Sequence, residues 1–109
     1  MQEMTIDLNA VTGTKHIRNL SGKERGIAAR QHFCLDSIDG QPGTVEVRIP
    51  EYVDTISPSF FQGLFSQSIA ALHGKDAFLK KYHFIVNEQQ KRWVDVGIRN
   101  ATSSRQSLV

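Results

Sequence analysis

Apolar and polar positions alternate with the period of a strand in some stretches of this chain and with the period of a helix in others. Stretches with strand periodicity and stretches with helical periodicity follow one another along the chain. A period of two predicts short strands over Met4–Leu8 and Thr44–Ile49, each with one apolar and one polar face. A third apolar run, Tyr82–Val86, predicts a buried strand, whereas Lys15–Leu20 fits a short strand and an ordered loop equally well. Longer stretches with helical spacing separate these strands.

The first helix is predicted over Gly22–Ile38. Ser21–Glu24 has the sequence of a capping box, in which a serine oxygen and a glutamate carboxylate bond each other's backbone N–H groups. Ile27 and Ile38 fall on the predicted buried face, although Gly26 costs this helix ~1 kcal/mol relative to alanine. The side chains expected near solvent are Arg25, Arg30, His32, Asp36 and Asp39.

The second helix is predicted over Pro58–His73. Its apolar arc is broad, as expected for a helix that lies flat on a sheet, and Gly63 and Ser68 are small enough to allow close approach of a neighbour. Gly74 is expected to supply the left-handed residue that ends this helix. A short amphipathic bridge, Lys75–Lys81, then leads to the last strand.

A second capping box begins the last helix, with Asn87 as the cap and Gln90 reaching back, which predicts a helix over Glu88–Asn100. Its expected buried stripe is Trp93, Val94, Gly97, Ile98 and Ala101. The pattern indicates one domain over residues 1–101 and a polar tail over 102–109. The predicted fold class is α/β: a single small domain with a mixed or partly parallel sheet of about four short strands, packed by about three helices.

Composition excludes several classes of function. The chain has 109 residues, a formal net charge of +2 and one cysteine, so we expect neither an internal disulfide nor an electrostatic footprint for nucleic acid. The basic residues of the C-terminal third are scattered and are best explained as solvated helix faces. No apolar run is long enough to cross a bilayer and no signal peptide is visible, so a cytoplasmic protein without a membrane partner is expected.

The sequence predicts no metal site, cofactor or catalytic centre. The four histidines do not form a ligand pair at helical spacing, and Cys34 is expected to be a small core residue rather than a nucleophile. Neither a glycine-rich phosphate loop nor a Ser-His-Asp signature nor a pair of catalytic carboxylates can be read. A non-enzymatic protein is therefore expected.

The most informative polar positions lie where the second helix begins. Ser57 and Ser59 precede and enter its first turn, where free N–H groups favour an anion or a phosphate. The favoured interpretation of Ser57 is an N-cap, because proline at the next position is favoured at the start of a helix. The two roles are compatible, and either serine could be phosphorylated, which would change the local charge.

Two blocks of the chain resemble a known family. Leu20–Arg30 is one block; the other is Val45–Ile49 followed by Ile56–Phe65. Together they are similar to the STAS-like family of small bacterial domains and, more distantly, to the STAS domains of anti-anti-sigma factors. Arg48 and the pair Gln62-Gly63 stand where the STAS-like family usually has acidic residues.

The resemblance implies a regulatory domain that binds a protein partner, often a serine kinase of the ATPase type. It places partner contacts at the strand-to-helix turn, here Ser57, Ser59, Phe60 and Gln62, with Ser57 and Ser59 as possible phosphorylation sites. The Asp-Ser-Ser-Gly turn of anti-anti-sigma factors is absent, so both serines stay candidates. The alternative is an interaction or inhibitor protein from a mobile element, such as a phage or gene cassette, acting as a homodimer.

Overall fold

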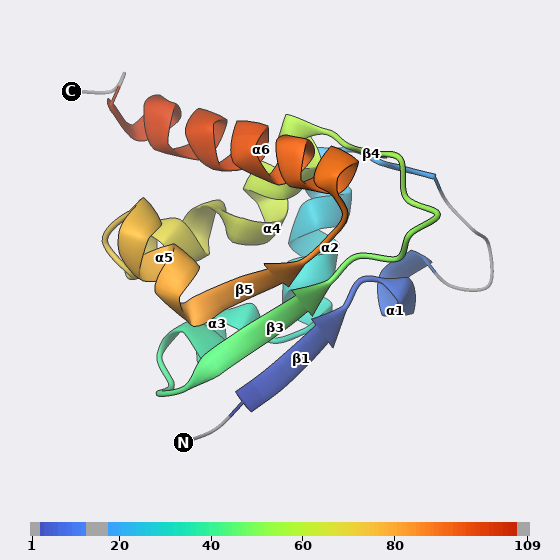
Figure 1. The fold of residues 1–109 in the computed structure, drawn as a ribbon. Coiled ribbons are helices and arrows are strands. Elements are labelled where there is room, and N and C mark those ends of the chain that lie inside the picture. Colours follow the sequence, from blue (N-terminus) through green and yellow to red (C-terminus); the bar gives the residue numbers. More distant parts are fainter. Residues whose placement is uncertain (1–2, 13–17, 107–109) are drawn as a thin grey trace.

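A computed structural model describes residues 3–12 and 18–106, with side chains described for 3–10 and 18–102. The elements in chain order are β1 (Glu3–Asp7), α1 (Asn9–Thr12), β2 (Asn19–Leu20), α2 (Lys23–His32), α3 (Leu35–Asp39), β3 (Thr44–Arg48), β4 (Thr55–Ile56), α4 (Pro58–Ala71), α5 (Lys75–Lys81), β5 (Tyr82–Ile85) and α6 (Glu88–Gln106). Strands β1, β3 and β5 form a sheet in that order, with both pairings parallel (Figure 1). The predicted α/β fold class is confirmed.

The main sheet has one buried and one open face. Ile6, Val45 and Val47 are buried, and Figure 1 shows α2 and α4 behind the sheet. The alternate positions form the open face: Glu3, Thr5, Asp7, Glu46, Arg48, His83 and Ile85. Strand β5 was predicted to be buried, which is correct for Tyr82 but wrong for Ile85, whose exposed fraction is 47%. The cause is the open face, which leaves every second residue of β5 in solvent.

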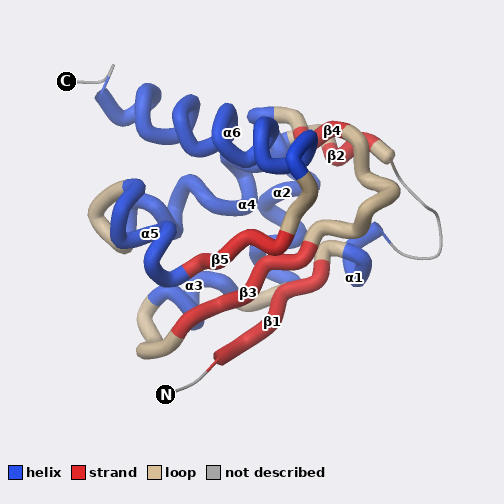
Figure 2. Tube along the Cα trace, in the orientation of Figure 1, coloured by secondary structure: helices blue, strands red, loops and turns tan. Residues whose placement is uncertain are grey.

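A second, two-stranded sheet pairs β2 with β4 in parallel, as the tube in Figure 2 shows above the main sheet. The backbone carbonyl of Arg18 accepts from the N–H of Asp54 at 2.7 Å, and that of Leu20 accepts from the N–H of Ser57 at 2.7 Å. The ambiguous stretch therefore ends as a strand, while its residues 15–17 lie outside the described part of the chain. This small sheet fixes the start of α4.

The predicted long helix over residues 22–38 is wrong. Cys34 adopts a left-handed conformation (φ 57°), which divides the stretch into α2 and α3, and its side chain is exposed rather than in the core. The expected capping box is also absent, because Gly22 is the N-cap and Ser21 makes no capping bond. Ile27 is 36% exposed, and the buried residues of α2 are Gly26, Ala29 and Arg30. Helix α2 therefore buries a different face from the one that the sequence predicts.

Helix α4 is the centre of the packing, and it has the broad apolar arc that the sequence predicts. Its buried residues are Phe60, Phe61, Gly63, Leu64, Phe65, Ser68 and Ile69. The ring of Phe65 lies 5.2–5.6 Å, between centroids, from the rings of Phe61, Phe78, Tyr82 and Phe84. The left-handed residue after α4 is His73 (φ 67°) rather than the predicted Gly74, which begins α5 with a φ of 133°.

Helix α6 begins at the predicted capping box. The side chain of Asn87 accepts from the N–H of Gln90 at 2.8 Å, and the side chain of Gln90 accepts from the N–H of Asn87 at 3.2 Å. The helix runs on through Gln106, so most of the segment predicted to be a polar tail is helical. In the part of the chain that the structure describes, no helix is long and apolar enough to cross a membrane.

Candidate functional site

The candidate site is the turn from β4 into α4, here named the β4–α4 corner (residues 55–64). Ser57 caps α4, because its Oγ accepts from the N–H of Phe60 at 3.2 Å, and Pro58 occupies the first helical position as predicted. The hydroxyl oxygens of Ser57 and Ser59 lie 3.0 Å apart. Ser57 is half-buried whereas Ser59 is exposed, so Ser59 presents the accessible hydroxyl.

The other two predicted contact residues differ in their access to a partner. Gln62 is half-buried, so part of this α4 residue is accessible to a partner. Phe60 is only 3% exposed, because its side chain points into the interior between α4, α2 and β2. Phe60 therefore presents almost no accessible surface to a partner.

Helices α2 and α4 cross in direct backbone contact at two glycines. A Cβ atom on Gly26 would lie 2.2 Å from the carbonyl oxygen of Phe60, and one on Gly63 would lie 2.2 Å from that of Lys23. The contact is reciprocal, so neither position can carry a side chain unless the helices separate. The sequence predicts close approach at Gly63 but not at Gly26, for which it predicts only a cost in helix stability.

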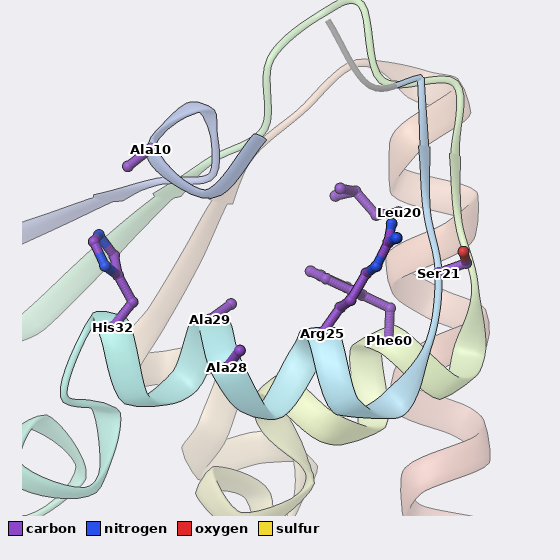
Figure 3. Close-up of a pocket in the computed structure, with 8 residues that line it drawn as sticks. All are labelled: Ala10, Leu20, Ser21, Arg25, Ala28, Ala29, His32 and Phe60. Atoms are coloured by element: carbon purple, nitrogen blue, oxygen red, sulfur yellow. The ribbon is translucent and has the colours of Figure 1, made fainter. Parts of the chain in front are cut away.

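This crossing leaves a pocket beside the corner. It has a volume of about 450 Å³ and lies between α1, β2, α2 and α4. In Figure 3, Ala28 and Ala29 form its floor on α2, Arg25 stands beside Phe60 at one end, and His32 stands at the other. Its described lining contains no carboxylate. Phe60, in the first turn of α4, belongs to the corner and also lines the pocket.

A buried ion pair holds the far end of α2 in place. The guanidinium of Arg30, whose side chain is 6% exposed, donates to Asp39 at 2.7 Å and to Ser68 Oγ at 2.8 Å. It also donates to Asp36 at 2.6 Å, but that carboxylate is 80% exposed and contributes little. Both Arg30 and Asp39 were expected near solvent, and this expectation is wrong, because each is neutralised and hydrogen-bonded by the other in the interior.

Tyr82 extends this network into the main sheet. Its hydroxyl donates to Asp39 Oδ1 at 2.5 Å, while Ser68 donates to Asp39 Oδ2 at 2.8 Å. Burial, reinforced by the hydrogen bond to Asp39, raises the pKa of the Tyr82 hydroxyl well above its usual value. Among the described residues every buried side-chain polar atom has a hydrogen-bond partner. The network thus has a structural role, since it ties α2, α3, α4 and β5 together.

Gln90 positions the segment that leads into the corner. Its side chain is buried and donates to the carbonyl oxygens of Pro50 at 2.8 Å and Val53 at 3.0 Å. One glutamine therefore completes the cap of α6 and fixes the turn between β3 and β4. The capping role was predicted from the sequence, whereas the contact with the turn joins residues about forty positions apart, which local pattern cannot reveal.

A second hollow, of about 480 Å³, lies at the carboxyl ends of the parallel strands, the usual place for a ligand in α/β folds. Some of its polar groups bond one another or residues nearby: Asp7 accepts from the N–H of Asn9, and Tyr52, beside the hollow, donates to the side chain of Asn9 at 2.6 Å. Arg48 is paired with Glu46 at 2.7 Å. Within the described residues no three His, Cys, Asp or Glu side chains are grouped to hold a metal. The bonds among Asp7, Asn9 and Tyr52 order the loops around this hollow.

Comparison with known proteins adds no relative: no protein-family model, no curated protein and no solved structure matches the chain. The resemblance to STAS-like domains stays a prediction that rests on the residues given above.

Proposed function

We propose that the chain is a non-enzymatic regulatory domain that binds a protein partner in the cytoplasm through the β4–α4 corner and the adjacent face of α2. The observation that supports this most is the exposed hydroxyl of Ser59 in the first turn of α4, a helix of 14 residues held rigidly at its start. The small β2–β4 sheet, the cap at Ser57 and the glycine crossing all fix this turn. A site on so rigid a frame loses little entropy when a partner binds.

The partner class comes from the STAS-like resemblance, which favours a serine-kinase-type ATPase. Of the two candidate serines, Ser59 is the better phosphorylation site. The oxygen of Ser57 already caps α4, so its modification would remove a capping bond, whereas Ser59 bonds the Ser57 oxygen from an exposed position. A phosphate on Ser59 would be favoured by the positive end of the α4 dipole and would present a new charge to the partner.

The test is the Ser59→Asp variant, with Ser59→Ala and Gln67→Asp as matched controls. Aspartate in the first turn of a helix is tolerated or mildly favourable, so the melting temperature should stay within a few degrees of the wild type. We expect Ser59→Asp to capture the partner from host lysate several-fold less efficiently, as measured by quantitative mass spectrometry. Gln67 is exposed further along α4 and adds the same charge outside the corner.

Equal capture by Ser59→Asp and Gln67→Asp would contradict the proposed site. If the wild type itself recovers no ATPase, the kinase assignment fails, although the corner can still be tested against whichever protein is recovered.

The alternative is a mobile-element protein that acts as a homodimer, and the free edges of the main sheet support its homodimer part. Among the described strands, β1 and β5 each pair only with β3, so both have a free edge, and Ile85 on β5 is 47% exposed. Light scattering on the same preparations separates the two proposals. A dimer mass together with no captured partner would favour the homodimer, and a monomer would exclude it.

A further inference from the structure

We infer that the pocket between α2 and α4 binds a small aliphatic carboxylate. Its volume of about 450 Å³ falls within the range of about 300–1,000 Å³ typical of small-molecule sites. Its walls come from four separate elements, which encloses a compact molecule better than an extended peptide. The inference concerns this pocket alone and does not depend on the partner proposed for the corner.

The apolar part of the ligand is indicated by the walls of the pocket. Leu20 and Phe60 form one side, and Ala28 and Ala29 form the floor, as Figure 3 shows. The two alanines leave space where larger side chains would fill the pocket. An unbranched hydrocarbon chain lying along α2 would bury apolar surface on both sides.

The anionic group is indicated by the charges at the pocket. Arg25 is exposed, and in the described part of the chain no hydrogen bond or ion pair joins it to another residue. Since the described lining contains no carboxylate, the guanidinium can bind an incoming carboxylate with two parallel hydrogen bonds and no competing carboxylate among these lining residues. The charge of the pocket therefore complements a monoanion and disfavours a cation.

The length of the pocket along α2 limits the length of the ligand. Arg25 and His32 both lie on α2, seven positions apart, which corresponds to about 10 Å along a helix axis. A medium-chain monocarboxylate bound at Arg25 would extend across Ala28 toward His32. It would also contact Phe60, whose N–H donates to Ser57, so the ligand would touch the first turn of the corner.

The test is an NMR titration of the full chain with octanoate, and with 1-octanol as the uncharged analogue. We expect saturable shifts of the amides around Ala28, Ala29 and Leu20 with octanoate, and weaker binding of octanol. Arg25→Gln should weaken octanoate binding roughly tenfold, as expected when a charge-assisted hydrogen bond is lost, and leave octanol binding unchanged. Arg99→Gln is the matched control, because Arg99 is exposed on α6 and does not line the pocket.

A second variant tests the apolar half of the site. Ala28 is exposed, so Ala28→Phe should fold normally while filling the pocket, and it should weaken both octanoate and octanol. The inference is overturned if no saturable binding occurs, if Arg25→Gln leaves octanoate affinity unchanged, or if the shifts map away from α2. None of these outcomes alters the comparison of Ser59→Asp with Gln67→Asp in partner capture, so the two proposals fail separately.

Discussion

The glycine crossing of α2 and α4 makes a strong prediction: Gly63→Ala should destabilise the protein, although alanine is the better helix former. The added Cβ would lie 2.2 Å from the carbonyl oxygen of Lys23 and 2.9 Å from the nitrogen of Ile27. Both atoms belong to the backbone of α2, so no side-chain rotation can relieve the overlap. The helices must move apart by about 1 Å to restore normal contact, and the packing between them loosens.

The expected magnitude follows from two opposing terms. Overpacking of a core costs about 1–3 kcal/mol, and a clash with backbone belongs at the upper end of that range. Replacing glycine by alanine inside a helix returns about 1 kcal/mol. The net loss is therefore about 2 kcal/mol in the free energy of unfolding, which lowers the melting temperature of a domain of this size by roughly 10 °C.

Calorimetry and urea unfolding of four variants would check this reasoning: Gly63→Ala, Gly26→Ala, the double variant and a control. Gly40→Ala is the control, because its Cβ would meet the carbonyl oxygen of Ser37 at an ordinary 3.7 Å and its φ is −90°. The double variant Gly26→Ala/Gly63→Ala should cost less than the sum of its parts, because one separation of the helices accommodates both methyl groups. A Gly63→Ala protein that melts at or above the wild-type temperature would show that the helices do not touch there.

Two further predictions concern the core. Phe65→Ala should cost about 3–5 kcal/mol by urea unfolding, whereas Ile85→Ala should be nearly neutral because its side chain is 47% exposed; similar losses for the two would disprove the assignment of the sheet faces. Tyr82→Phe tests the buried network by its pH dependence. The unfolded chain ionises Tyr82 near its usual pKa of about 10 while the folded chain does not, so wild-type stability should fall by up to about 1.4 kcal/mol per pH unit above pH 10. The variant lacks this contribution, so its stability should approach that of the wild type between pH 9 and 11, and a constant difference would refute the raised pKa.

The sequence predictions that the structure contradicts failed for a common physical reason. The stretch over residues 22–38 has helical spacing throughout, yet Cys34 turns left-handed, and in the resulting arrangement Asp39 on α3 contacts the buried guanidinium of Arg30. Arginine and aspartate are normally read as surface residues, and the partners that permit their burial come from Ser68 and Tyr82, far along the chain. No periodicity within one helix carries that information.

The candidate site also has some features that the sequence predicts and others that only the tertiary structure determines. Ser57 could be assigned as a cap from its neighbours alone, because the N-cap and the following proline act within one turn. The burial of Phe60 and the position of Arg25 at a pocket depend on where β2 and α2 pack against α4, which only the assembled fold defines. The sequence therefore located the corner but not the pocket beside it.

By itself the sequence determined the local features of this protein: the alternating strands β1 and β3, the cap and apolar arc of α4, the capping box of α6 and hence the α/β class. These follow from interactions over a few residues, which propensity and periodicity encode directly. The tertiary structure alone decided the crossing at Gly26 and Gly63, the burial of Arg30 with Asp39, and the open face of the sheet. Each of these depends on contacts between elements distant in sequence. The contribution of a residue to stability there depends on tertiary partners that the adjacent residues in the sequence do not identify.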